Sequence, residues 1–161
     1  MFRKTFIALA LPVAAVAAII PATGAPAAPS GSMTLMSRLD TKTLVMIDAA
    51  RPKGRSAGDT VTFSTTLLRD GKAAGRGEFA QTLADNRYQG IVIQGQLLLP
   101  DGTIALQGGG LDRRPPGGAA PSSENDMAIV GGTGAYAGAS GTARLTDAGR
   151  TTQRVDITLM P

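Results

Sequence analysis

The chain has 161 residues, 16 of them basic and 12 acidic, which gives a formal net charge of +4. It contains no histidine and no cysteine, so the common zinc and copper sites, histidine-based catalytic triads, cysteine nucleophiles and disulfides are all excluded. Basic residues are spread along the chain except in the segment RPKGR at 51–55, and only 4% of the residues are aromatic. We therefore expect no metal, no cofactor and no nucleic-acid partner.

The N-terminal segment has the pattern of a secretory signal peptide over residues 1–27. Arg3 and Lys4 precede an uncharged, largely apolar stretch at 5–20, and Pro12 within this stretch argues against a stable membrane span. Cleavage after Ala27 would leave a mature chain of 28–161 with 14 basic and 12 acidic residues, a net charge of +2. The mature protein would then be secreted or otherwise extracytoplasmic. An uncleaved N-terminal anchor is the alternative.

Residues 28–40 are expected to form a tether, with added pairing at a sheet edge by MTLMSRL at 33–39 as the alternative. Short β-strands are expected to follow. In the second expected strand, Val61, Phe63, Thr65 and Leu67 alternate with threonine and serine, which is typical of a half-buried strand. Turn signals such as Asp70-Gly71 separate the strands. The strands are expected within the runs 41–49, 58–71, 75–85, 87–99, 102–108, 126–130, 141–147 and 151–160.

Eight regularly spaced strands, with no helical segment, predict an all-β chain. A single eight-stranded antiparallel β-barrel over 41–161 is expected, because closing the sheet removes its exposed edges; a β-sandwich is the alternative. The Gly-, Pro- and Ser-rich connection at 109–125 is too long for an ordinary hairpin loop. It is interpreted as a lid over the barrel mouth or as a disordered insertion, in which Arg113 and Arg114 could attract an acidic ligand.

The glycine-rich sequence GGTGAYAGASG at 131–141 raises the possibility of a phosphate-binding loop. A Rossmann fingerprint opens a helix, and a P-loop carries a lysine before serine or threonine. This segment has no lysine and leads into another expected strand. Its glycines are therefore expected to permit a tight strand-to-strand crossing, with positive φ or a close backbone approach.

Three blocks of the sequence resemble a known superfamily. They are GDTVTFSTTLL at 58–68, RYQGIVIQGQLLLPDGTIALQG at 87–108 and MAIVGGTGAYAGASGTARL at 127–145. In their order and spacing they are similar to the blocks of the allene oxide cyclase and dirigent protein superfamily, namely G-D-x-x-P-F, an R-[FY]-E-A block ending in V-Q-G, and G-G-x-G followed by an aromatic residue. The resemblance covers most of 41–159 and implies a calycin-like eight-stranded barrel with an apolar pocket at its mouth, often assembled as a trimer.

The polar groups of the plant cyclase pocket are not retained. When the sequences are aligned through the shared I-D pair at 47–48, the catalytic glutamate and a neighbouring asparagine fall on Thr43 and Val45. A pocket asparagine falls on Thr65, and a pocket cysteine falls near Phe79. An enzyme that opens allene oxide needs the carboxylate to stabilise developing positive charge, so true allene oxide cyclase activity is not expected.

The dirigent pattern is retained in part. Its arginine is replaced by Ser140, which removes a cation that could orient a phenolic oxygen. Asp48 matches an aspartate at the end of the first dirigent strand, and Tyr136 keeps the aromatic position.

The barrel interior is the expected place for a ligand. The candidate pocket residues either wall a pocket or fill the barrel as core, and they are Val45, Ile47, Phe63, Thr65, Phe79 and Tyr136. The candidate acid–base groups are Asp48, Glu78 and Tyr136, with a solvated carboxylate or an aromatic cap on the barrel as the alternative reading of each. Three glutamines within apolar strands are expected to face outward or to bond across strands: Gln94, Gln96 and Gln107.

Together these features favour an exported barrel that binds an apolar or phenolic small molecule. The barrel would direct cyclisation or stereoselective coupling of this molecule without covalent catalysis, since a closed pocket accelerates a reaction by holding reactive conformers. As an enzyme it would be an isomerase-like, cyclase-like or dirigent-like protein, assembled as a homotrimer. A non-catalytic ligand-binding or structural β-barrel is the alternative.

Overall fold

The computed structural model describes residues 29–49, 56–84, 90–111 and 125–161. The expected signal peptide at 1–27, the basic segment at 51–55 and most of the connection at 109–125, with Arg113 and Arg114, lie outside the described residues. The described ranges contain no helix with the length and apolar character needed to cross a bilayer.

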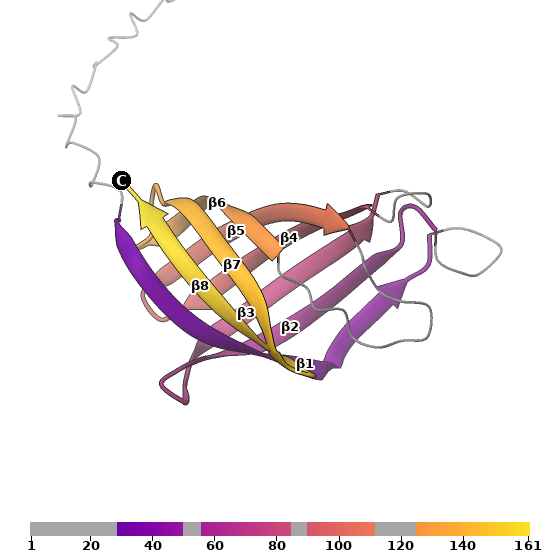
Figure 1. Cartoon of the computed structure of the whole chain (residues 1–161), viewed down its shortest axis with the longest axis horizontal. Helices are drawn as coiled ribbons and strands as arrows, with labels where there is room; N and C mark the ends of the chain where they lie inside the picture. The colour runs from indigo at the N-terminus through magenta and orange to yellow at the C-terminus, as the bar shows by residue number, and fades with distance from the viewer. Residues whose placement is uncertain (1–28, 50–55, 85–89, 112–124) are drawn as a thin grey trace, which may run out of the picture.

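The described chain is all-β and forms a closed, antiparallel eight-stranded barrel in which each strand pairs with the next and β8 pairs with β1 (Figure 1). This confirms the expected fold. Its strands are β1 (Gly31–Ile47), β2 (Thr60–Arg69), β3 (Lys72–Leu83), β4 (Gly90–Leu99), β5 (Gly102–Leu111), β6 (Asn125–Gly134), β7 (Ser140–Gly149) and β8 (Thr152–Met160).

The first strand begins earlier than the sequence suggests. Residues from Gly31 onward, which were expected to be a tether, pair with β8 from Gly31↔Leu159 to Arg38↔Thr152. Leu35 is fully buried within this stretch. The expectation of a tether up to residue 40 is therefore wrong, because the segment is ordered by a partner strand at the far end of the chain.

Alternation along each strand separates an apolar interior from a polar exterior. Phe63, Thr65 and Leu67 of β2 face the interior, and their partners on β3, including Gly77 and Phe79, face the same side. The interior is packed mainly with aliphatic side chains, among which Leu35, Leu67, Leu97, Ile104, Ala143 and Val155 are fully buried. The alternation predicted for the second strand is thereby confirmed.

The two ends of the barrel differ. At the closed end, which joins β2 to β3, β4 to β5 and β6 to β7, the inward-facing Leu97, Leu99 and Leu159 are buried. At the open end, where β3 and β5 finish and β4 and β6 begin, the inward-facing Val61 and Ile91 are only partly buried, although Leu83 at the end of β3 is buried. In Figure 1 the closed end lies at the left, where β1 starts and β8 finishes.

The glycine-rich sequence at 131–141 forms the connection from β6 to β7 at the closed end. Gly134 has a φ of 61°, and a Cβ atom there would collide with the carbonyl oxygen of Asp101. A Cβ atom at Gly132 would collide with the carbonyl oxygens of Tyr136 and Thr103. The prediction of a tight strand crossing is confirmed at both glycines.

Candidate functional site

Two stacked phenylalanines lie inside the barrel between its centre and its open end. Phe63 of β2 is paired with Phe79 of β3, and their rings are 5.4 Å apart with an angle of 19° between their planes. Glycine makes room for the Phe79 ring, because a Cβ atom at Gly95 would lie 2.5 Å from its Cδ1 atom and one at Gly77 would lie 2.8 Å from its Cε2 atom. Gly77 of β3 and Gly95 of β4 therefore leave room for the Phe79 ring beside the barrel wall.

Next to this pair lies a buried hydroxyl group without a hydrogen-bond partner. The side chain of Thr65 is 5% exposed, and its Oγ1 atom has no partner. A Cβ atom at Gly77 would come to 2.5 Å from Thr65 Oγ1, which places the hydroxyl beside the bare backbone of β3. Nearly all buried polar groups in proteins are hydrogen-bonded, so an unpartnered hydroxyl in an apolar interior is a marker for a missing partner.

Polar side chains that were not among the candidate residues also face the interior towards the open end. Gln81 has the same orientation as Phe79 along β3, and the buried Ser37 lies opposite Gln153 in the β1–β8 ladder. Gln153 Nε2 donates to Asp147 Oδ1 at 3.3 Å. Counting every second residue from Phe79 would have found Gln81, whereas Ser37 was hidden by the expectation of a tether.

Val45 and Ile47 do not line the interior, contrary to expectation. Their exposed fractions are 53% and 54%. The β1–β2 register shifts between Asp40 and Val45, and the β8 ladder on β1 ends at Arg38. After this shift Val45 and Ile47 lie opposite Thr62 and Thr60, which face outward, so their side chains point away from the interior.

Tyr136 is buried at the closed end, away from the other pocket candidates. Its hydroxyl donates to Asp101 Oδ2 at 3.2 Å. Burial, together with the hydrogen bond to Asp101 and the charge of Asp101, raises the pKa of Tyr136, whereas nearby Arg69 opposes this shift. This geometry matches an aromatic cap on the barrel. Of the candidate pocket residues, only Phe63, Thr65 and Phe79 are brought together, and ligand binding by them stays a prediction.

The candidate carboxylates lie outside the interior. Asp48 is exposed after the end of β1, and Glu78 lies on the outer face of β3, where its side chain is 40% exposed. Glu78 accepts from Gln96 Nε2 at 3.0 Å and lies 3.5 Å from Arg76 Nε. Both carboxylates therefore have the surroundings of surface groups. Among the described residues, no three potential ligands are grouped to hold a metal ion.

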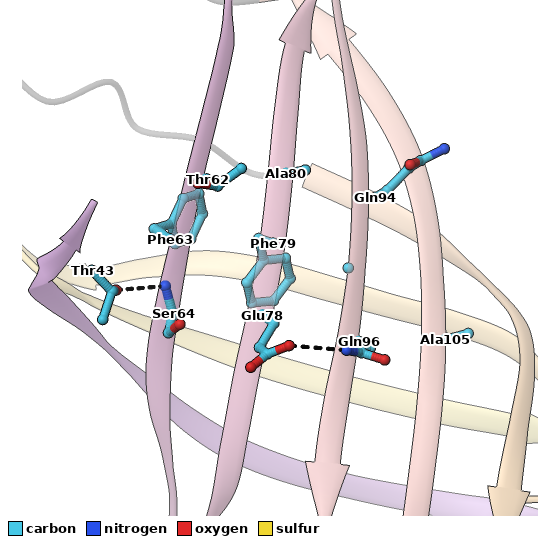
Figure 2. Close-up of a pocket in the computed structure, with 11 residues that line it drawn as sticks. Thr43, Thr62, Phe63, Ser64, Glu78, Phe79, Ala80, Gln94, Gln96 and Ala105 are labelled. Carbon is cyan, nitrogen blue, oxygen red and sulfur yellow. Dashed lines mark hydrogen bonds between the residues drawn. The ribbon is translucent and has the colours of Figure 1, made fainter. Parts of the chain in front are cut away.

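A broad hollow of about 480 Å³ lies over the outer face of β2 to β5 (Figure 2). Three of the residues that line it are small, namely Ala80, Gly95 and Ala105, and Glu78 lines it as well. The other residues that line it are Thr43, Thr62, Phe63, Ser64, Phe79, Gln94 and Gln96. Gln94 and Gln96, like Gln107, are exposed, as expected for outward-facing glutamines.

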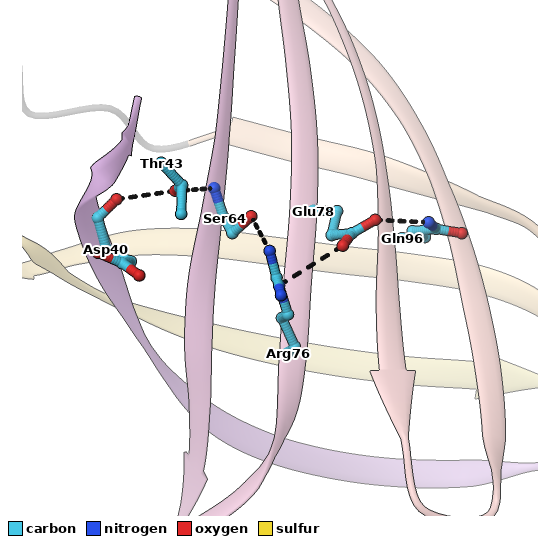
Figure 3. A network of polar contacts seen from close by, with 6 residues as sticks. All are labelled: Asp40, Thr43, Ser64, Arg76, Glu78 and Gln96. Atoms are coloured by element: carbon cyan, nitrogen blue, oxygen red, sulfur yellow. Dashed lines mark hydrogen bonds and ion pairs between the residues drawn. The ribbon is translucent and has the colours of Figure 1, made fainter. Parts of the chain in front are cut away.

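A chain of polar contacts crosses one side of this hollow from β1 to β4 (Figure 3). Thr43 Oγ1 accepts from the Ser64 amide at 2.8 Å, and Arg76 Nη2 donates to Ser64 Oγ at 2.7 Å. The chain continues through Glu78 to Gln96. These outward-facing groups are paired with one another, which contrasts with the unpartnered hydroxyl of Thr65 inside the barrel.

Comparison with solved structures finds barrels of the same fold. "Pyocyanin demethylase" has a TM-score of 0.66 at 24% identity, covering 81% of this chain and 100% of its own. A pterocarpan synthase dirigent protein has a TM-score of 0.60 at 20% identity, covering 82% and 95%, and an exo-specific intermolecular Diels-Alderase has a TM-score of 0.57 at 13% identity, covering 81% and 98%. No family model and no curated protein matches the sequence. The barrel fold implied by the resemblance to dirigent proteins is thus confirmed.

Proposed function

We propose that the barrel binds an apolar or phenolic small molecule in its interior towards the open end and directs cyclisation or coupling of that molecule by shape. The observation that carries this proposal is the buried, unpartnered Oγ1 of Thr65 beside the Phe63–Phe79 stack. An oxygen atom of the ligand would supply the missing hydrogen bond. An aromatic ring of the ligand would pack against the two phenylalanine rings in an offset-stacked or edge-to-face arrangement.

The reaction class is supported by what the similar barrels are named for. A pterocarpan synthase dirigent protein and an intermolecular Diels-Alderase share the fold of this chain, and "Pyocyanin demethylase" does so too. In these names the same barrel is linked to the chemistry of small organic molecules. Fold alone does not assign a substrate, so the proposal for this chain rests on its own interior.

The chemistry would rely on positioning. Holding the reacting atoms in a productive arrangement lowers the barrier of a cyclisation or coupling without any nucleophile. Thr65 would anchor one oxygen of the ligand, the two rings would fix the plane of its aromatic part, and the aliphatic interior would exclude water. Of the inward-facing positions in the described strands, Asp147 at the open end is the one with a carboxylate.

A matched pair of probes tests the anchor. 1-Naphthol and naphthalene differ by one hydroxyl group, and a hydrogen bond to Thr65 should make 1-naphthol bind about 5- to 10-fold more tightly in calorimetric titrations. The Thr65→Val variant should bind 1-naphthol and naphthalene about equally tightly. The Thr66→Val variant, changed on the other face of the same strand, should keep the preference for 1-naphthol. If wild type binds neither probe, or if Thr65→Val keeps the preference, the proposed site is wrong.

A non-catalytic ligand-binding barrel is the second candidate. It is favoured by the closed half of the barrel, where Leu97 and Ile104 are fully buried. Native mass spectrometry of the protein purified from its own host would reveal a co-purifying small molecule. If that molecule is recovered unchanged after prolonged incubation with the protein, the non-catalytic reading is favoured over the catalytic one.

We further propose that the protein acts outside the cytoplasm after removal of residues 1–27, and as a homotrimer. The basic, apolar and small-residue regions of the N-terminal segment support export. N-terminal sequencing of the exported protein tests this directly, because cleavage after Ala27 predicts Ala28 as the first residue. An intact N-terminus at Met1 in the exported protein would contradict it.

A further inference from the structure

Gln81 is a polar side chain on the inner wall of the barrel with apolar neighbours around it. It lies between Phe79 and Leu83 on the inner face of β3, and both of these are buried. Across the two ladders it lies opposite Val61 of β2 and Ile93 of β4. None of these four side chains can form a hydrogen bond with a carboxamide, which has two donor hydrogens and an acceptor oxygen. The adjacent wall therefore offers the Gln81 side chain no side-chain partner.

Thr65 has the same kind of surroundings on the other side of the aromatic pair. It lies between Phe63 and Leu67 on the inner face of β2, and opposite Leu39 of β1 and Gly77 of β3. Its hydroxyl group is buried and has no partner. From the middle of the barrel to its open end, the inner wall thus presents a polar group, a pair of stacked rings and a second polar group.

The other inward-facing polar side chains towards the open end lie on other strands. Ser37 and Gln153 are opposite each other where β1 meets β8, and Gln153 Nε2 donates to Asp147 Oδ1 at 3.3 Å. Asn125 lies at the start of β6, three strands from β3. Of the inward-facing polar side chains in the described strands, Gln81 is therefore the one that shares a strand with the ring pair and lies on its open side.

We propose that the ligand of this barrel is an elongated aromatic molecule with a polar group at each end, one bonded to Thr65 and the other to Gln81. The inference rests on the proposed function and narrows its substrate class. Gly77, opposite Thr65, and Gln81 are four residues apart on β3, which corresponds to about 14 Å of strand. The glutamine side chain reaches across part of this distance, so two linked aromatic rings with an oxygen at each end have a suitable length.

A second anchor would fix how the ligand lies in the barrel. With a single hydrogen bond to Thr65, the aromatic body of the ligand can turn about that bond. A hydrogen bond to Gln81 at the other end removes this freedom and keeps one face of the ligand against the phenylalanine rings (Figure 2). The opposite face is then the one on which a bond forms, and fixed orientation is what favours one product. Gln81 would thus determine specificity without taking part in the chemistry.

Three probes test the second anchor in the full wild-type chain by calorimetric titration. They are 4-phenylphenol, 4,4′-dihydroxybiphenyl and 2,4′-dihydroxybiphenyl, which differ in the presence or position of a second hydroxyl group. We expect 4,4′-dihydroxybiphenyl to bind about 5- to 10-fold more tightly than 4-phenylphenol, because its far hydroxyl reaches Gln81. The 2,4′ isomer should gain no such affinity, since its second hydroxyl lies beside the junction of the two rings.

Gln81→Met removes the carboxamide but keeps a long, unbranched side chain. In this variant the preference for 4,4′-dihydroxybiphenyl should fall to the about twofold statistical advantage of two equivalent ends. Gln94→Met is the matched control, because Gln94 is exposed on the outer face of β4, and it should keep the full preference. Circular dichroism would verify that both variants are folded, and the comparison of the two isomers in wild type needs no variant.

The outcomes separate this inference from the proposed function. Suppose that wild type binds 4-phenylphenol and that Thr65→Val weakens this binding. The second anchor is then overturned, while the proposed ligand site stands, if wild type binds the two isomers equally or if Gln81→Met keeps the full preference. If wild type binds none of the three probes, the ligand site and its second anchor are both wrong.

Discussion

Replacing Thr65 by valine should stabilise the protein. On folding, Thr65 Oγ1 loses its water and gains no partner, a loss that typically costs about 1–3 kcal/mol in proteins. Valine keeps the β-branched shape and puts a methyl group in the place of the hydroxyl. We expect the free energy of unfolding to rise by about 1–2 kcal/mol, measured by urea denaturation of the protein without ligand.

The matched control is Thr66→Val on the same strand. Thr66 is only partly buried and its hydroxyl can reach water, so the change should stay within about 0.5 kcal/mol. An equal gain in both variants would mean that valine is a better strand former at either position, and a loss of stability in Thr65→Val would mean that its hydroxyl has a partner. Either result would refute the reasoning from an unpartnered buried group.

Three further predictions concern turns and titrating groups. Gly134→Ala should destabilise the fold by about 1–3 kcal/mol in thermal denaturation because φ is 61° there. Gly149→Ala should leave the stability nearly unchanged, because a Cβ atom there would make only ordinary van der Waals contact with Thr152, at 3.8 Å. Tyr136→Phe should lower the free energy of unfolding, measured by urea denaturation, by about 1 kcal/mol. Because the pKa of Tyr136 is raised from 10.0, this difference between the variants should be present below about pH 10 and should shrink as the pH rises through the folded-state pKa of Tyr136. The Thr34 hydroxyl lowers the pKa of Asp156 from 3.8. Thr34→Val should therefore be less stable than wild type above about pH 4, and this difference in the free energy of unfolding, measured by urea denaturation, should vanish as the pH falls through the folded-state pKa of Asp156.

Those features that depend on local pattern could be predicted from the sequence. The alternation of Val61, Phe63, Thr65 and Leu67 determines which side of β2 faces inward, because side chains of a strand alternate between its faces. The glycines at 131–141 lack the lysine and helix of a phosphate loop, and Gly134 takes the expected left-handed backbone. Regular spacing of such strands was enough to indicate a barrel.

Those features that depend on distant partners could not be predicted in the same way. Gly31 starts a strand because Leu159 lies opposite, and no local pattern reveals a partner at the other end of the chain. Val45 and Ile47 look like core residues by composition, yet β8 is too short to flank them. Tyr136 occupies the expected aromatic position, but only the strand order shows that this position closes the end opposite to the partly exposed interior residues.

The seam between β1 and β8 sets the barrel apart from a simple chain of hairpins. All other ladders join strands that follow each other in sequence. Forming each of them closes only the connection between two neighbouring strands, whereas forming the β1–β8 ladder closes a loop of nearly the entire domain. The entropy of long-range closure is thus concentrated in one pair of strands. Separation along this line would unroll the wall into a flat sheet while leaving every hairpin intact.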